Sequence, residues 1–180
     1  MRTINKKLNQ EIKNKKFIKS LSKSIMEIIK NYKFIEETSS QFSPESIELV
    51  AKFSFILSKK LLTSLNNSNN ITTETIYNNT EKYLKGELKH HALHQSRKVF
   101  ITNKSISLRP RLNINFKIFN YLLPKNKTIS NIAATSLSYV LEYIITEILE
   151  ISINQANNII FPEDIVSTIT KENELKFCIN

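Results

Sequence analysis

The chain contains a single glycine, Gly86, among its 180 residues. Nucleotide-binding loops of the Walker and Rossmann types need several glycines, because the backbone must approach phosphate closely. Folds rich in β-hairpins also rely on glycine at their tight turns. The sequence therefore excludes these nucleotide sites and predicts an all-α fold, with helices joined by segments rich in Asn, Ser, Thr and Pro.

Hydrophobic periodicity and capping residues predict the helices of the first half. Residues 1–16 are rich in lysine and asparagine, and we expect a basic flexible tail there. Apolar residues recur at helical spacing over 17–33. Ser43 before Pro44 is a typical helix start, and that helix is expected to run to about residue 65. Shorter helices are expected after Thr72 or Thr73, up to Gly86, and over 87–102.

The second half repeats the same order of short, long and short helices. We expect a moderate helix over 112–123, a long helix capped by Ser130 that runs to about residue 157, and a short helix that begins at Pro162. The long helix is roughly 40 Å in length. A single three-helix unit cannot bury the apolar face of such a helix, so we expect the two halves to pack against each other.

Charge is distributed in blocks along the chain. Residues 1–33 carry a net charge of +8 and residues 84–127 carry +9, whereas residues 34–83 carry −2 and residues 128–180 carry −5. Two strongly basic blocks predict a polyanionic partner, above all nucleic acid. A solvated lysine surface that only improves solubility is the alternative.

Other residue patterns argue against catalysis, metal binding and membrane insertion. Cys178 is the only cysteine, so an intrachain disulfide is impossible, which fits a reducing compartment. No apolar run approaches the ~20 residues of a membrane span, and the N-terminal segment lacks the apolar core of a secretory signal. His90 and His94 are four residues apart on a predicted helix, with His91 beside them, but a further ligand is not evident. A nucleophile–base–acid set is also not evident, so we expect neither an enzyme nor a cofactor.

Three glutamates interrupt the most apolar segment, "VLEYIITEILEI". A helical wheel places Glu142, Glu147 and Glu150 on one face, apart from the apolar positions. Residues 128–157 contain no cation, which is unusual in a chain with a net charge of +10. The segregated acids indicate a docking surface, and an ordinary solvated helix face is the alternative.

Several segments resemble two core histones. "VLEYIITEILEI" resembles the central helix of histone 2A, and "IIFPEDI" resembles the start of its third helix. "SISLRPRLNI" and "NYLLPKN" resemble its arginine-bearing entry segment and first helix. In the first half, "NITTETIY" and "LKGELKHHA" resemble segments of histone 2B. The motifs occur in order with compatible spacing over about residues 17–177, so the chain is similar to a histone 2B–histone 2A doublet, a fusion of the kind encoded by large DNA viruses of amoebae.

The resemblance implies two histone folds in tandem that form an intramolecular pseudodimer. Residues 17–105 would be the 2B-like fold with its C-terminal helix, and residues 106–180 the 2A-like fold without the family's C-terminal docking segment. The halves would clasp head to tail, with crossing long helices and loops paired at two ends. The implied function is the packaging of viral DNA into nucleosome-like particles, in the host nucleus or viral factory and in the virion.

The resemblance also implies partners and site residues. The partners would be double-stranded DNA, histone 3- and histone 4-like proteins or a fused doublet of them, and proteins that bind an acidic patch. The acidic-patch candidates are Glu87, Glu142, Glu147, Glu150, Glu172 and Glu174. The DNA-contact candidates are cations and helix-start residues: Lys33, Arg97, Lys98, Lys104, Arg109, Arg111, Lys117, Lys125, Lys127, Ser43, Thr73 and Ser130.

The sequence departs from the family pattern in its loops. The segments "NNSNN", "NNIIF" and "EETSSQF" lack the expected cations. If "EETSSQF" pairs with "NNIIF", that end has only Lys33 nearby, while the other end keeps Lys125 and Lys127. We therefore expect a weaker and lopsided grip on DNA. The departures also favour an alternative function, a histone-fold regulatory or interaction module that binds other histone-fold proteins with little DNA wrapping.

Overall fold

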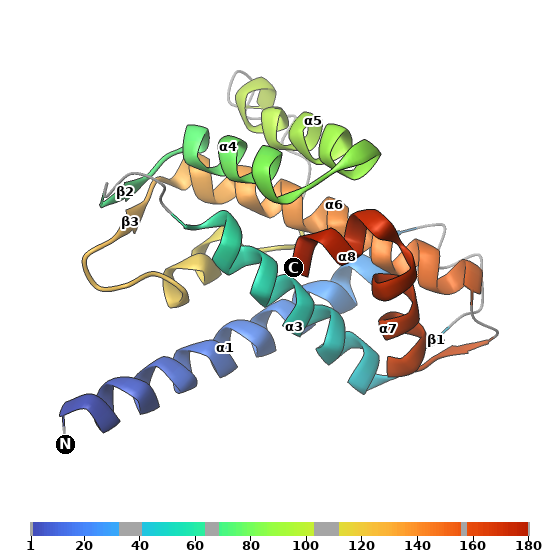
Figure 1. The fold of residues 1–180 in the computed structure, drawn as a ribbon. Helices are drawn as coiled ribbons and strands as arrows, with labels where there is room; N and C mark the ends of the chain where they lie inside the picture. The colour runs from blue at the N-terminus through green and yellow to red at the C-terminus, as the bar shows by residue number, and fades with distance from the viewer. Residues whose placement is uncertain (1, 33–40, 64–68, 103–111, 156–157, 180) are drawn as a thin grey trace.

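The computed structural model describes residues 2–32, 41–63, 69–102, 112–155 and 158–179 (Figure 1). The regular elements of this part of the chain are helices and four two-residue strands, which confirms the all-α prediction. The first half contains α1 (Arg2–Asn31), α3 (Pro44–Leu61), α4 (Thr73–Tyr83) and α5 (Gly86–Thr102). The second half contains the 3-10 helix η2 (Phe116–Tyr121), the long α6 (Asn131–Gln155), α7 (Pro162–Lys171) and α8 (Asn173–Ile179).

Local capping explains where the main helices begin. The Ser43 hydroxyl accepts a hydrogen bond from the Ser46 N–H at 3.2 Å, and Pro44 occupies the first turn. Thr72, rather than Thr73, caps α4 by accepting from the Thr75 N–H at 3.3 Å. The Ser130 hydroxyl accepts from the Ala133 N–H at 3.2 Å at the start of α6.

Two short parallel strand pairs join the halves. Strand β1 (Gln41–Phe42) pairs with β4 (Ile159–Ile160), and β2 (Asn70–Ile71) pairs with β3 (Thr128–Ile129). Each pair combines one strand from each half, and each strand directly precedes a helix. The starts of α3 and α7 therefore meet at one end of the molecule, and the starts of α4 and α6 meet at the other.

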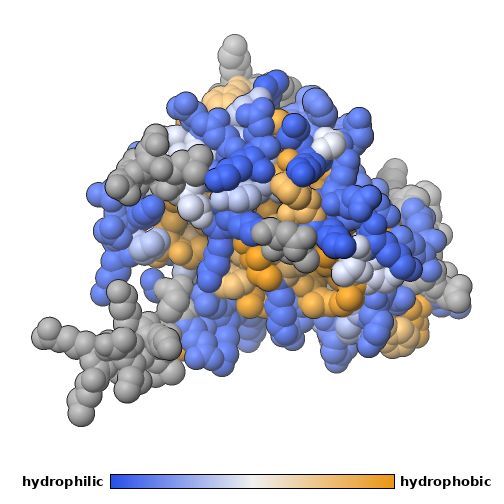
Figure 2. Space-filling model, in the orientation of Figure 1, coloured by the Kyte–Doolittle hydropathy of each residue, from blue (hydrophilic) through white to orange (hydrophobic). Residues whose placement is uncertain are grey.

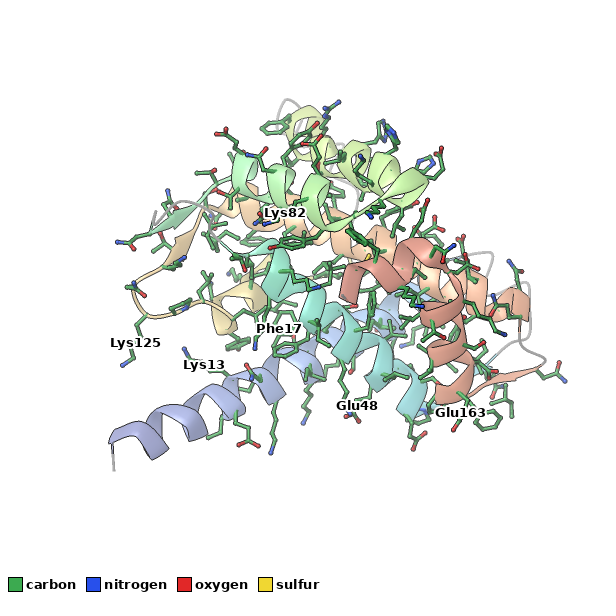
Figure 3. All side chains as sticks on the ribbon, viewed as in Figure 1. Lys13, Phe17, Glu48, Lys82, Lys125 and Glu163 are labelled. Atoms are coloured by element: carbon green, nitrogen blue, oxygen red, sulfur yellow. The ribbon has the colours of Figure 1, made fainter. Side chains whose placement is uncertain are left out.

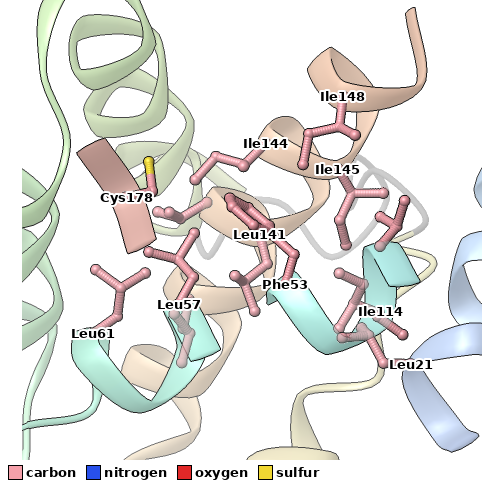
Figure 4. Packing of buried hydrophobic residues seen from close by; sticks show 14 of the residues in the cluster. Leu21, Phe53, Leu57, Leu61, Ile114, Leu141, Ile144, Ile145, Ile148 and Cys178 are labelled. Atoms are coloured by element: carbon pink, nitrogen blue, oxygen red, sulfur yellow. The ribbon is translucent and has the colours of Figure 1, made fainter. Parts of the chain in front are cut away.

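The two halves share one hydrophobic core. Fully buried leucines of α3, Leu57 and Leu61, belong to the same cluster as Leu141 and Ile144 of α6 (Figure 4). Helix α6 packs against α3, α4, α5 and α7, so its apolar surface is covered by elements from both halves. Burying one such side chain stabilises the fold by about 1.5–3 kcal/mol. The expectation that the halves hide each other's apolar faces is confirmed.

Helix α1 is longer than predicted, because residues 2–16 continue the helix instead of forming a flexible tail. The segment contains neither proline nor glycine before α1 ends. A helix nucleated by the packed residues from Phe17 onward extends at low cost, since each added residue gains a hydrogen bond. The first turns of α1 project beyond the other elements (Figure 1).

The segment before α6 is less helical than predicted. Instead of a helix over 112–123, only Phe116–Tyr121 form a 3-10 helix, with Asn115 capping it through the Lys117 N–H at 3.0 Å. The preceding Asn113 and Ile114 direct their backbone N–H groups to Glu142 of α6. These hydrogen bonds to Glu142 hold Asn113 and Ile114 in a non-helical conformation.

By length and composition alone, helix α6 could cross a membrane. It was not identified from the sequence, because the glutamates interrupt every long apolar run in this segment. However, 72% of its most apolar window is buried inside the protein. The core of the folded chain therefore accounts for its hydropathy.

Candidate nucleic-acid interface

The end formed by β2 and β3 brings two helix starts together. The Thr128 N–H donates to the Asn69 carbonyl at 2.8 Å, and the Ser130 N–H donates to the Ile71 carbonyl at 3.3 Å. Thr73 and Ser130, at the starts of α4 and α6, are thereby held near each other. The first N–H groups of a helix lack intrahelical acceptors and carry a partial positive charge. Two adjacent helix starts suit an anionic phosphate.

Lysines lie in the turn next to this end. Lys125 is exposed and Lys127 is half-buried in the turn directly before β3, where the Lys127 N–H donates to the Pro124 carbonyl at 3.0 Å. Exposed Lys117 lies on η2, which packs against α1. Lys13 of α1 and Lys125 lie on the same side of the molecule (Figure 3). The β2/β3 end therefore presents Lys125 and Lys127, while Lys117 and Lys13 belong to η2 and α1.

Arg97 of α5 lies beside the same end. It lines a small hollow of about 260 Å³ together with Thr73, Tyr77 and Ser136, and one acid, Glu74 in the first turn of α4, also lines it. Its guanidinium donates to the Tyr77 hydroxyl at 2.9 Å and lies 5.3 Å from the centre of the Tyr77 ring. Tyr77 therefore orients Arg97 near the start of α4. Lys98 on the same helix is half-buried.

The end formed by β1 and β4 has the opposite character. Residues 41–46 and 158–164 contain no lysine or arginine, and they include Glu45, Glu163 and Asp164. The Asp164 carboxylate accepts from the Phe161 N–H at 2.8 Å and so occupies the helix start that a phosphate would need. Ser43 lies here, and its N–H donates to the Ile160 carbonyl at 3.1 Å. This end is poorly suited to bind an anion.

Four candidate contacts, Lys33, Lys104, Arg109 and Arg111, lie outside the described residues. Six of the eight described candidates lie at one of the two ends, and Lys98 and Lys117 lie on α5 and η2. Lys125, Lys127, Arg97, Thr73 and Ser130 gather at the β2/β3 end, whereas Ser43 is isolated among acids at the other end.

An acidic cluster forms on another part of the surface, around Tyr143 of α6. Burial, a hydrogen bond to Glu147, and the charges of Glu147, Glu174 and Glu150 together raise the pKa of Tyr143. Glu87 joins this group through His91, whose Nε2 lies 3.6 Å from the Glu87 carboxylate and whose ring centre lies 5.9 Å from that of Tyr143. We call Glu87, Glu147, Glu150 and Glu174 the acidic cluster.

Glu174 also has a structural role. Its two carboxylate oxygens accept from the backbone N–H groups of Glu87 at 3.0 Å and Leu88 at 2.8 Å. Glu174 of α8 thus caps the start of α5, whose first residue, Gly86, lies in the left-handed region at φ 56°. A Cβ atom on Gly86 would collide with the Glu174 carboxylate.

Glu142, which the helical wheel placed on the same face as Glu147 and Glu150, has partners of its own. Its carboxylate accepts from the Asn113 N–H at 2.9 Å, the Asn113 side-chain amide at 2.8 Å and the Ile114 N–H at 3.4 Å. Burial raises the pKa of Glu142, against the opposing effect of these hydrogen bonds. Asn113 also accepts from the Asn31 side chain at 2.8 Å, which ties this group to the end of α1.

The remaining residues that the sequence analysis singled out have individual surroundings. Glu172 separates α7 from α8, and its N–H donates to the Thr168 carbonyl at 3.1 Å. Burial raises the pKa of the Cys178 thiol to about 12, and the thiol donates to the Glu174 carbonyl at 3.3 Å. In the described part of the chain, His90, His91 and His94 do not belong to any group of three His, Cys, Asp or Glu side chains that could hold a metal ion.

Sequence reasoning missed Tyr143 and Asn113, which organise the glutamates. Tyr143 was visible as a polar aromatic residue among the three acids, but Asn113 contacts Glu142 across 29 residues and left no local signal.

A comparison of the chain with protein-family models and with curated proteins matched none of these models or proteins.

Proposed function

We propose that the chain is a histone 2B–histone 2A doublet that packages DNA by binding its phosphate backbone without sequence preference. The observation that carries this proposal is the head-to-tail strand pairing, β1 with β4 and β2 with β3, at the two ends of one shared core. The resemblance to the two histones implies this pairing of loops. The helices, in contrast, were predicted from periodicity and capping residues alone.

The chemistry of the β2/β3 end supports a backbone-binding role. Lys125 and Lys127 supply charge, while the starts of α4 and α6 supply oriented N–H groups. Histone-type binding uses such contacts, together with arginines in the minor groove, and does not read base edges. The contrast with the acidic β1/β4 end supports a lopsided grip.

Partners follow from the same proposal. The acidic cluster is suited to proteins that dock through arginine or lysine side chains, and it comprises Glu87, Glu147, Glu150 and Glu174 without Glu142. Histone 3- and histone 4-like proteins, or a fused doublet of them, would complete the particle. The site of action would be the host nucleus or viral factory, and the virion.

A histone-fold interaction module is the second candidate function. It is favoured by exposed apolar side chains on the surface: Ile159 and Phe161 at the β1/β4 end are 49% and 51% exposed, and Ile56 of α3 is 44% exposed. Figure 2 shows an apolar area in the middle of the face over α3, surrounded by hydrophilic residues. Such areas suit protein partners more than DNA.

Nuclease digestion of reconstituted particles separates the two functions. The full chain is mixed with duplex DNA of random sequence and with a histone 3–histone 4 tetramer, and protected DNA lengths are measured. Packaging predicts a discrete protected length that exceeds the protection by the tetramer alone. An interaction module predicts association with the tetramer but no additional protection.

A further inference from the structure

The N-terminal part of α1 projects from the protein as a helix. The first fully buried side chain described in α1 is Phe17, followed by Leu21, Ile25 and Ile28. Of the elements, α3, η2 and α6 contact α1. The roughly 15 residues before Phe17 span about 22 Å at the rise of an α-helix. Figure 1 shows these turns extending past the rest of the molecule.

The described side chains of this region are strongly basic. Between residues 11 and 23, α1 carries five lysines and one acid, Glu11. Lys15 lies 3.6 Å from Glu11, which offsets one of these charges. Lys16, Lys19 and Lys23 are exposed and follow one another at spacings of three and four residues, so they occupy one side of the helix. Lys13 lies on the same side of the molecule as Lys125 (Figure 3).

As a separate peptide, a helix of this kind would be marginal, and its continuity with the packed part of α1 supports it. Isolated helices of about 12–15 residues are marginal in water, and like charges at spacings of three and four residues repel. A polyanion that binds along the lysines removes this repulsion. A helix also holds its lysines in fixed positions, so less conformational freedom is lost on binding than for a flexible tail.

We infer that the N-terminal part of α1 is a rigid basic arm that binds the backbone of duplex DNA and extends the contact that begins at the β2/β3 end. This inference rests on the proposed DNA-binding function. It differs from a flexible electrostatic tail, because the helical form of the arm, and not only its charge, contributes to affinity. The arm also supplies cations to a molecule whose β1/β4 end lacks them in its described residues.

Two matched substitutions at Asn14 separate helix from charge. Asn14→Pro leaves the charge unchanged. Proline is tolerated in the first turn of a helix, so a helix can still begin at residue 14, but the helix before residue 14 is interrupted. Asn14→Ala removes the same side chain and preserves the helix. A third variant, K13Q/K16Q/K19Q, removes charge and preserves the helix.

Affinity for a random-sequence duplex is measured over a range of salt concentrations, with nuclease protection as a second readout. Asn14→Pro leaves Lys16, Lys19 and Lys23 on a helix but frees Lys13 and the residues before it from helical geometry. We expect this variant to weaken binding about tenfold and to shorten the protected DNA, and Asn14→Ala to match the unmodified chain. K13Q/K16Q/K19Q should lower the slope of log K against log salt by about three, one for each lysine contact.

The outcomes distinguish the arm from the proposed function. If the full chain protects DNA and Asn14→Pro binds as tightly as Asn14→Ala, the inference of a rigid arm is wrong, and the segment acts only through its charge. If the full chain neither binds nor protects duplex DNA, the proposed function fails and the arm fails with it. Circular dichroism checks that Asn14→Pro loses only the helical signal of the arm.

Discussion

At the scale of single residues, Glu142 and Glu174 serve the fold through their carboxylates. Glu142 accepts three hydrogen bonds from Asn113 and Ile114, and Glu174 caps the start of α5. Removing the Glu142 carboxylate would leave the partly buried N–H groups of Asn113 and Ile114 without this partner, and removing that of Glu174 would do the same to the N–H of Leu88, at a cost of roughly 1–3 kcal/mol per group. A substitution at Glu142 or Glu174 that weakens partner binding would therefore not by itself identify a docking residue.

The raised pKa of Glu142 predicts a specific pH dependence. Burial raises this pKa above its ordinary value of 4.5. The folded state therefore binds the proton more tightly than the unfolded state, and Glu142 contributes stability below pH 4.5 that is lost as pH rises through the folded pKa. In urea unfolding, the stability of the unmodified chain relative to Glu142→Gln should increase as pH is lowered from 7 to 4.5. A difference that stays constant or decreases would contradict the assignment.

Gly86→Ala should destabilise the protein by about 2–3 kcal/mol. The left-handed conformation costs a residue with a Cβ atom roughly 1–2 kcal/mol, and displacing Glu174 removes a helix cap worth about 1 kcal/mol. The free energy of unfolding from a urea titration measures the loss. Glu174→Gln is the control, since it retains the shape and one acceptor oxygen and should cost less. Equal stability of Gly86→Ala and the unmodified chain would show that neither the left-handed conformation of Gly86 nor its contact with Glu174 restricts this position.

Residues with local partners were predictable from the sequence, and residues with distant partners were not. Ser43, Thr72 and Ser130 cap helices through N–H groups three residues away, so their spacing in the sequence suffices. Glu174 and Glu142 contact residues 86–87 and 28–29 positions away, so only the tertiary fold reveals them. A helical wheel orders residues around one helix, but it cannot show which neighbour covers each face.

At the scale of elements, α1 and η2 differ from prediction for opposite reasons. The lysines and asparagines of residues 2–16 predict a flexible tail, but the packed helix that follows them extends through these residues. The apolar residues of 112–123 read as a helix, but contacts with Glu142 hold the first of them in place. Propensity decides neither case, because the neighbouring element imposes the conformation.

The contrast between the two strand-paired ends predicts an unequal contribution to DNA binding. Lys125→Ala combined with Lys127→Ala should weaken duplex binding and lower the slope of log K against log salt by about two. Lys33→Ala, which tests the cation nearest in sequence to the other end, should have a smaller effect. Fluorescence anisotropy with a labelled duplex measures both. An equal or larger effect of Lys33→Ala would show that the grip is not lopsided.

At the scale of the whole molecule, the fold solves a burial problem that neither half solves alone. Helix α6 is covered by α3 and α4 from the first half and by α7 from the second. Strand pairs at both ends fix the register of the halves. The same pairing brings helix starts together in twos, so the arrangement that buries the core also creates the candidate phosphate site at the β2/β3 end.

An interlocked core predicts that the halves depend on each other for folding. If the chain is divided between residues 105 and 106, each fragment exposes apolar side chains that the intact chain buries, such as Leu57 in one and Leu141 in the other. Each fragment alone should show little cooperative thermal unfolding by circular dichroism. Mixing them should restore helical signal and a cooperative transition, with a midpoint that rises with concentration because folding is now bimolecular. A fragment that unfolds cooperatively by itself, at a midpoint independent of concentration, would show that it has a separate core, and would contradict the proposed head-to-tail pseudodimer.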